Sequence, residues 1–419
     1  MNVRDGILDA MTASRTTWAE EQAARFCGFP LTAETVFLRL KYEKGGEKEV
    51  CDLLLALRSE AIVLSLKHQE DPRHRTGEHL ARWCTKAAKD AARELGGALK
   101  TIQSRPFWCD HVKRGRLEFK PGALRIRHAI ACVETAEGIE LPNDLPDDLR
   151  GIPVTYMTSS DLLNIVKELH SFADIMEYLD ARLKMSRGLR RTIGLEEPLY
   201  SYYLLNDQSF DGCQDFEDVI AILDAEGEEL ERRIAEKHKA DSLAEIIESV
   251  AYSLDQPPPD AVTPGAGVSA RFAGALQEAD HTKAQEYLCD LRLGERRTIG
   301  EKFLEARAKV QQEPQGFVYS TMYSDGRDFL LVCAVAKRLD KAKIFERAES
   351  LLSLSLAHHR KNVGMIVVER EGGAYVTMLI EGKIDSPEAI AAGNRLFGHH
   401  RITHTPIRLL PEEGYTTDP

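Results

Sequence analysis

The 419-residue chain has no long apolar run and no clustered cysteines. Nothing in it approaches the roughly 18 to 20 apolar residues that a membrane-spanning helix requires. The first 21 residues carry acidic side chains and no apolar core, a pattern that is not typical of a secretory signal. The eight cysteines include no C-x-x-C pair, which argues against structural zinc and against a disulfide framework. We therefore expect a reduced, cytoplasmic protein without a membrane partner.

Three common catalytic motifs are also absent from the sequence. There is no G-x-x-x-x-G-K-[ST] loop and no G-x-G-x-x-G segment after a strand, so the sequence offers no loop that would cradle a nucleotide. There is no G-x-S-x-G segment either, which argues against an α/β-hydrolase esterase.

Charge is distributed unevenly along the chain, whose net charge is −12. Between Arg73 and Arg127 there are 14 lysines and arginines and 5 acidic residues, a local net charge of +9. A basic zone on an acidic chain favours a defined site for a polyanion over nonspecific adhesion to nucleic acid. A solvated charged surface is the alternative explanation of the same pattern.

The apolar pattern predicts an α/β fold in several parts. A mixed sheet flanked by helices is expected in residues 1–160, and a helical region in 161–255. A linker of prolines and small residues occupies 256–270. Residues 271–419 are expected to form helices and then an α+β domain with a β-β-α-β-β unit, of unknown role. Within the first part we expect a helix at 14–27, strands at 34–42, 49–57 and 61–67, a helix at 78–100, and strands at 124–133 and 152–157.

One constellation in the first part carries the chemistry. Asp52 lies near the start of one expected strand, and a short turn leads into a second strand that ends in Ser65-Leu66-Lys67. Side chains alternate along a strand, so Ser65 and Lys67 share a face that a neighbouring strand can bring close to Asp52. A lysine at the end of an apolar strand calls for a partner, because burying an unpaired ammonium is costly.

This arrangement resembles the PD-(D/E)XK, or restriction-endonuclease-like, nuclease superfamily over roughly residues 14–160. The resemblance implies a mixed sheet in the order α-β-β-β-α-β, with Mg²⁺ (or Mn²⁺) held by carboxylates beside a catalytic lysine. By position, it makes Asp52 a metal ligand and Lys67 the lysine that positions or deprotonates water. The structural alternatives are a strand-edge acid paired with a cation and a strand-end lysine that extends into solvent.

The sequence departs from the family pattern at Ser65, which stands where the triplet's acid is expected. Some members with S-x-K take the missing acid from a glutamate on the following helix. Glu78, at the start of the expected helix, is the candidate replacement, although an acid in a helix's first turn is also favoured by the helix dipole. Weaker candidates are Glu49, as a further metal ligand, Gln69 and Glu70. Glu20 or Glu21, on the expected first helix, could also complete the site, as first-helix glutamates do in many relatives.

The expected helix at 78–100 also carries a stripe of cations. Arg82, Lys86, Lys89 and Arg93 are spaced by four, three and four residues, which places them on one helix face. Beside a phosphodiesterase site they would contact nucleic-acid phosphates, and otherwise they form a solvated face. The basic stretch at 105–128, with Phe107 and Trp108, would line a nucleic-acid groove or form an exposed loop at a strand edge.

Together these features lead to two functional hypotheses. The first is a Mg²⁺-dependent endonuclease that cleaves phosphodiester bonds, with DNA as the expected substrate. The second, motivated by Ser65, is a nuclease-like module that has lost its chemistry and binds nucleic acid or a partner protein. A nuclease-like domain joined by a linker to a second α/β unit also suggests, by analogy of architecture, a role in defence against foreign DNA. Whether the chain forms a homo-oligomer is left open.

Overall fold

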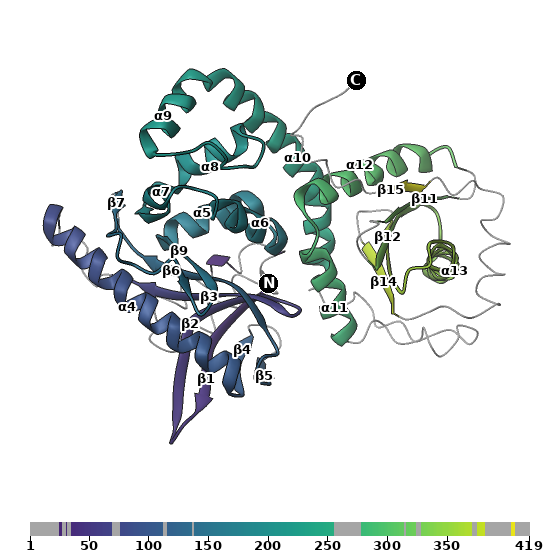
Figure 1. Cartoon of the computed structure of the whole chain (residues 1–419). Helices are drawn as coiled ribbons and strands as arrows, with labels where there is room; N and C mark the ends of the chain where they lie inside the picture. Colours follow the sequence, from purple (N-terminus) through teal and green to yellow (C-terminus); the bar gives the residue numbers. More distant parts are fainter. Residues whose placement is uncertain are drawn as a thin grey trace. The chain divides into compact units, whose positions relative to one another are not determined.

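The computed structural model describes residues 25–26, 31, 35–68, 76–111, 115–135, 138–254, 278–313, 316–323, 328–370, 375–381 and 404–406. The chain forms two compact units, Met1–Glu236 and Lys237–Glu412 (Figure 1). The expected linker at 256–270 lies outside the described residues, and the division between the units falls earlier, at Glu236. The expected helix at 14–27 also lies almost entirely outside them.

The first unit is built on a mixed eight-stranded sheet in the order β5-β4-β1-β2-β3-β6-β9-β8. Its strands are β1 (Val36–Glu43), β2 (Glu47–Leu57), β3 (Glu60–Lys67), β4 (Phe107–His111), β5 (Gly115–Phe119), β6 (Arg125–Val133), β8 (Asp148–Leu149) and β9 (Ile152–Met157). The three strands β1, β2 and β3 form an antiparallel meander, and β6 and β9 then add in parallel to β3. The α/β class and the mixed central sheet expected from the sequence are confirmed.

The basic stretch at 105–128 is not a loop, because most of it is strand. β4 and β5 form an antiparallel hairpin, and β4 pairs with the outer edge of β1. Phe107 is buried and stacks on Phe119 with ring centroids 5.0 Å apart, whereas Trp108 is half-buried beneath the guanidinium of Arg116. The alternation of buried and half-buried residues in β4 shows why this stretch forms a strand: one of its faces joins the core.

One long helix, α4 (Gly77–Ser104), lies across one face of the sheet and contacts β2, β3 and β6. Its buried residues recur at helical spacing and are mostly small, as at Ala87, Ala88, Ala91 and Ala98. Small side chains let a helix lie close to a sheet, so α4 holds its polar residues near the strands. This matters for the candidate site, because one of those polar residues reaches it.

The part of the first unit that follows β9 in the chain is mainly helical. They are α5 (Ser159–Leu169), α6 (Phe172–Arg182), α7 (Arg187–Arg191), α8 (Glu196–Leu205), α9 (Phe216–Ala225) and the start of α10 (Gly227–Leu254). Two two-residue strands, β7 (Ile139–Glu140) and β10 (Thr192–Ile193), pair beside them. The helical middle region predicted from the sequence is confirmed, and the stretch at 215–254 forms two helices that meet at Glu226.

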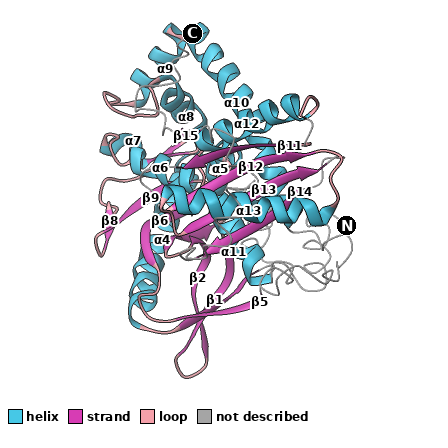
Figure 2. Cartoon of the chain, turned by 90° about the vertical axis from the view of Figure 1, so that its right-hand side faces the viewer, coloured by secondary structure: helices cyan, strands magenta, loops and turns pink. Residues whose placement is uncertain are grey.

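The second unit contains a five-stranded sheet in the order β14-β13-β12-β11-β15. Its strands are β11 (Phe317–Tyr323), β12 (Phe329–Ala336), β13 (Val363–Arg370), β14 (Tyr375–Glu381) and β15 (His404–Pro406). The helices are α11 (Glu278–Cys289), α12 (Leu293–Val310) and α13 (Lys341–His359), and α13 links β12 to the parallel β13 (Figure 2). The expected β-β-α-β-β unit is therefore present.

Candidate active site

Asp52 lies where the pairing between β2 and β3 ends. Backbone pairing runs from Leu57 opposite Glu60 to Leu53 opposite Leu64. One residue further along β2, the Oδ2 atom of Asp52 accepts a hydrogen bond of 2.7 Å from the backbone N–H of Leu66. The carboxylate thus accepts the N–H group that a backbone carbonyl of β2 would accept elsewhere in the β2–β3 pairing. This hydrogen bond holds the half-buried carboxylate at the edge of the core.

Ser65 and Lys67 project from β3 toward α4, as their shared strand face requires. Both contact the same carboxylate oxygen, Oε2 of Glu94 on α4. The Ser65 hydroxyl donates to it at 2.9 Å, and the Lys67 ammonium lies 2.5 Å from it. Ser65 is buried, while the Lys67 and Glu94 side chains keep access to solvent. A serine, a lysine and a glutamate therefore meet beside Asp52.

Burial has the largest effect on the carboxylates of this cluster, and neighbouring charges add to it. Burial raises the pKa of Asp52, and the charge of Glu94 raises it further, against the lowering effects of the Leu66 N–H and of Lys67. The pKa of Glu49 is also raised, first by burial and then by the charges of Asp52 and Glu94. Lys67 therefore compensates the three carboxylates only in part, and an added cation would be stabilised here.

A β-bulge brings Glu49 into this environment. Leu40 pairs with Cys51 but Lys41 pairs with Glu49, so β2 carries one extra residue, Val50. In a regular strand, the side chains of residues three apart point to opposite faces. The extra residue at the bulge shifts this alternation by one, so Glu49 and Asp52 can point to the same face. Arg39, next to the bulge on β1, has a left-handed φ of 52°, which is strained for a residue with a side chain. We refer to Glu49, Asp52, Ser65, Lys67 and Glu94 as the carboxylate–lysine cluster.

The structure brings together some of the residues named from the sequence and not others. Asp52, Lys67 and Glu49 share one electrostatic environment. Glu78 does not reach it, because it lies in the first turn of α4, sixteen residues before Glu94. At about 1.5 Å per residue this is roughly 24 Å along the helix axis. Gln69, Glu70, Glu20 and Glu21 lie outside the described residues.

The helix acid that lies beside Ser65 and Lys67 is Glu94, which was not among the residues predicted from the sequence. A glutamate on the following helix was expected, and Glu78 was predicted because it is the first acid on that helix. However, nine residues separate Lys67 from the first residue of α4, so the helix can begin far from the strand end. The sequence did contain a pattern that points to Glu94. Asp90, Glu94 and Gly97 are spaced by four and three residues, which places them on one side of α4, next to the buried stripe that faces the sheet.

The cluster has the donor chemistry that suits a hard divalent cation. Asp52, Glu94 and Glu49 offer carboxylate oxygens, which Mg²⁺ and Mn²⁺ prefer. The pKa values of Asp52 and Glu49 are raised in part by neighbouring carboxylates, which indicates that the region is short of positive charge. Across the described ranges, no group of three or more histidine, cysteine, aspartate or glutamate side chains is already arranged to hold a metal ion. The chemistry of Asp52, Glu94 and Glu49 therefore suits such an ion, but in this structure the three carboxylates are not grouped around one point.

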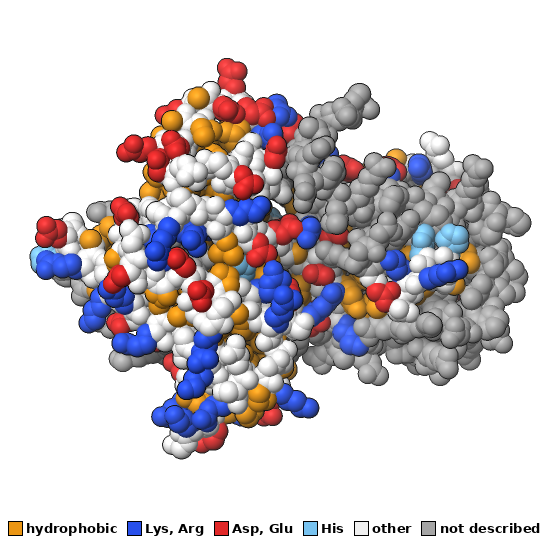
Figure 3. Space-filling model, viewed as in Figure 1, with side chains coloured by type: hydrophobic (Ala, Val, Ile, Leu, Met, Phe, Trp, Pro, Cys, Tyr) orange, Lys and Arg blue, Asp and Glu red, His pale blue; other side chains and the backbone are white. Residues whose placement is uncertain are grey.

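The predicted cation stripe lies on the exposed face of α4. Arg82, Lys86, Lys89 and Arg93 are all exposed. Lys89 forms an ion pair of 2.7 Å with Asp144, and Arg93, whose side chain is 76% exposed, contacts Asp90 at 2.9 Å. Figure 3 shows lysine and arginine side chains spread over the region of α4 and the β1–β2 hairpin. Exposed ion pairs of this kind are weak and can exchange for phosphate contacts.

A scan against protein-family models and searches of curated proteins and of solved structures each found no match to this chain. The function is therefore argued from the cluster itself. Among the helices that the structure describes, none combines the length and the apolar character needed to cross a membrane.

The raised pKa of Asp52 predicts a gain in stability when its charge is removed. The folded state binds a proton more readily than the unfolded chain, so the carboxylate costs stability once the pH rises above its unfolded pKa, near 3.9. We expect Asp52→Asn, which keeps an acceptor for Leu66, to raise the Tm at pH 7 but not at pH 3. Relieving such a site commonly adds about 0.5–2 kcal/mol. Thermal unfolding of both proteins at both pH values measures the effect, and an equal or lower Tm for Asp52→Asn at pH 7 would contradict it.

Proposed function

We propose that the first unit is a metal-dependent nuclease of the restriction-endonuclease-like kind, which hydrolyses phosphodiester bonds of nucleic acid, with DNA as the expected substrate. The observation that carries this proposal is the meeting of Asp52, Lys67 and Glu94 around Ser65 at one end of the β2–β3 pairing. The antiparallel meander β1-β2-β3, the helix α4 and the strand β6 parallel to β3 support it, because the resemblance implies these elements, although the hairpin β4–β5 is inserted between α4 and β6.

Each residue of the cluster has a defined task in this proposal. Asp52 and Glu94, with Glu49 nearby, would hold Mg²⁺, which stabilises charge on the phosphate that is cut. Lys67 would hold the attacking water through its ammonium or accept a proton from it. Ser65 keeps the Glu94 carboxylate in place by hydrogen bonding to it. The cation stripe of α4, which ends at Arg93, would contact phosphates on either side of the cut.

Removing Lys67 tests the proposal. We expect Lys67→Ala to lower the rate of Mg²⁺-dependent DNA cleavage by about 10²–10⁴-fold, the usual contribution of a general acid or base. Cleavage of labelled DNA by purified full-length protein, with and without Mg²⁺, measures the effect. Lys100→Ala, an exposed lysine on α4, is the matched control and should cleave like the wild type. Unchanged cleavage by Lys67→Ala, with a normal Tm, would remove Lys67 from the mechanism.

A second candidate function keeps the binding and drops the chemistry. Its support is the direct ion pair of Lys67 with Glu94, an arrangement that also serves as a purely structural bridge between β3 and α4. On this alternative, the protein binds nucleic acid or a partner protein and does not cut. Salt-sensitive DNA binding without Mg²⁺-dependent cleavage in the wild type would favour it over the first proposal.

A further inference from the structure

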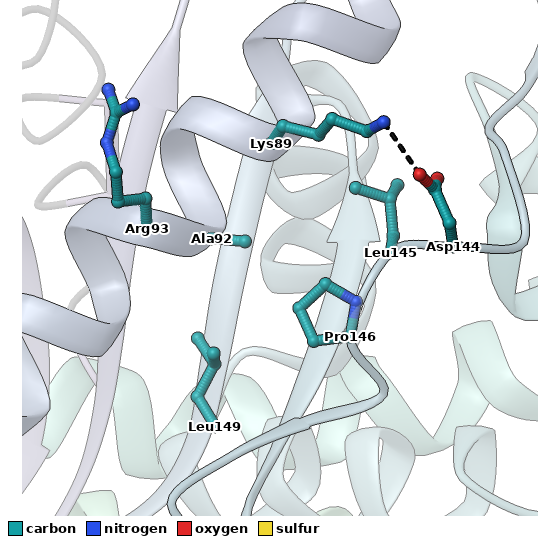
Figure 4. A pocket seen from close by; sticks show the side chains of 7 residues that line it. All are labelled: Lys89, Ala92, Arg93, Asp144, Leu145, Pro146 and Leu149. Atoms are coloured by element: carbon teal, nitrogen blue, oxygen red, sulfur yellow. Dashed lines mark hydrogen bonds and ion pairs between the residues drawn. The ribbon is translucent and has the colours of Figure 1, made fainter.

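A pocket of about 400 Å³ lies beside α4, away from the carboxylate–lysine cluster. It is lined by Lys89, Ala92, Arg93, Asp144, Leu145, Pro146 and Leu149 (Figure 4). Leu149 belongs to β8, at the end of the sheet, whereas the cluster stands on β2 and β3. The pocket and the cluster therefore open on two different sides of the same helix.

The lining is apolar at the base and charged at the rim. Ala92, Leu145, Pro146 and Leu149 supply the apolar surface. Lys89 donates to the Asp144 carboxylate at 2.7 Å, and Arg93 pairs with Asp90 at 2.9 Å, so each rim cation has an exposed acidic partner that a phosphate can displace. Such a lining suits a ligand with a flat apolar part, hydrogen-bonding edges and a neighbouring anion. A nucleotide has all three.

The surroundings of the pocket carry an excess of positive charge. The segment that lines the pocket continues to Asp147, and three arginines share this one carboxylate. Arg187, Arg190 and Arg191 lie 3.1, 3.7 and 2.6 Å from it. Arg191 also donates to the backbone oxygen of Leu145, which lines the pocket. An approaching polyanion is therefore attracted to this side of α4.

Arg93 and Glu94 connect the pocket with the cluster. They are consecutive on α4, so their side chains leave the helix about 100° apart and at nearly the same height. Glu94 turns to Ser65 and Lys67, while Arg93 lines the pocket. A strand of nucleic acid that crosses the exposed side of α4 at this height would touch both places.

We propose that the pocket receives one unstacked base of the same strand whose backbone is cut at the carboxylate–lysine cluster. This inference rests on the proposed nuclease function and adds the form of the substrate, a strand that is unpaired at this position. A helix with its side chains is about 10–12 Å wide. The captured base therefore lies a few nucleotides from the scissile phosphate.

Binding of oligonucleotides that each lack one base tests the pocket directly. The cleavage position is first mapped with the wild type. Fluorescence anisotropy then gives the Kd of the full-length Lys67→Ala variant, in the presence of Mg²⁺, for single-stranded DNA with an abasic site at each position in turn. We expect an abasic site at one position, a few nucleotides from the cut, to raise the Kd about tenfold, and other positions to have little effect.

Substitutions of the residues that line the pocket distinguish base binding in the pocket from general attraction between the protein and phosphate. Leu149→Asn, or the milder Pro146→Ala, in the Lys67→Ala background should lose the dependence on that one base. Arg93→Gln should weaken binding of every oligonucleotide and lower the salt dependence by about one phosphate contact. Lys100→Gln, two turns further along the same face of α4, should leave the profile of abasic positions unchanged.

The outcomes distinguish the two proposals. If the wild type cuts DNA and Lys67→Ala binds it, but no abasic position matters or Leu149→Asn and Pro146→Ala keep the same profile, the pocket does not hold a base and the nuclease proposal stands. If the wild type neither binds nor cuts DNA, both proposals are wrong.

Discussion

Replacing Glu94 with glutamine is expected to lower Mg²⁺-dependent cleavage by about 10³-fold or more. Glutamine keeps the size of the side chain and an acceptor for the Ser65 hydroxyl, but it removes a carboxylate charge from the cluster. Charge stabilisation by a bound divalent ion is worth several kcal/mol, and each 1.36 kcal/mol is about a tenfold change in rate. Initial cleavage rates over a Mg²⁺ titration measure the loss.

Glu78→Gln is the matched control for this prediction. Glu78 has the same charge and lies on the same helix, but in its first turn, roughly 24 Å from Glu94 along the axis. We expect its cleavage rate to stay within about twofold of the wild type, since removing an acid from an exposed first turn costs only a few tenths of a kcal/mol. The reverse result, an active Glu94→Gln and an inactive Glu78→Gln, would overturn the assignment of the acid to Glu94.

Breaking the buried ion pair between α6 and α8 is expected to cause a large loss of stability. Arg182 and Glu196 are each about 1% exposed, and the guanidinium donates to both carboxylate oxygens at 2.8 and 2.9 Å. Tyr178 donates to the same carboxylate at 2.6 Å. Arg182→Met leaves Glu196 as an uncompensated buried charge, which typically costs about 3–5 kcal/mol. Chemical denaturation of the full chain measures this loss.

Two further variants show whether the loss comes from the unpaired charge. Arg182→Met combined with Glu196→Leu should recover much of the stability, because replacing both partners by apolar residues leaves no charge to bury. Lys184→Met, which breaks the exposed pair with Asp211, should change the free energy of unfolding by less than about 1 kcal/mol. A double variant as unstable as Arg182→Met would show that packing, and not charge, explains the effect.

The fold of the first unit was predictable wherever the pattern of apolar residues was strong. The strands β2, β3, β6 and β9 contain apolar runs from which their positions follow. The position of the hairpin β4–β5 did not follow from the sequence, because its two strands have only five residues each and depend on pairing with β1 and with each other. Edge strands carry a weak pattern, since only one of their faces contributes to a core.

The candidate site was predictable only in the parts that local geometry determines. Strand alternation placed Ser65 and Lys67 on one face, and the short turn after Leu57 placed Asp52 near them. Glu78 lies far from Lys67 because the position of each helix acid depends on where α4 crosses the sheet. That position is set by the packing of Ala88, Ala91 and their neighbours and not by the length of the loop. The bulge at Val50, which admits Glu49, left no recognisable trace in the sequence.

The hydrogen bond from Leu66 to Asp52 has a consequence for how tightly an ion can be held. One oxygen of this carboxylate already accepts a hydrogen bond from the backbone, which leaves it less electron density for a metal ion. Mg²⁺ needs six ligands in a near-octahedral arrangement and keeps several waters when proteins supply few. We expect the free protein to retain the ion weakly, and the scissile phosphate to complete its coordination. Metal and nucleic acid would then bind cooperatively, each raising the affinity for the other by the same factor.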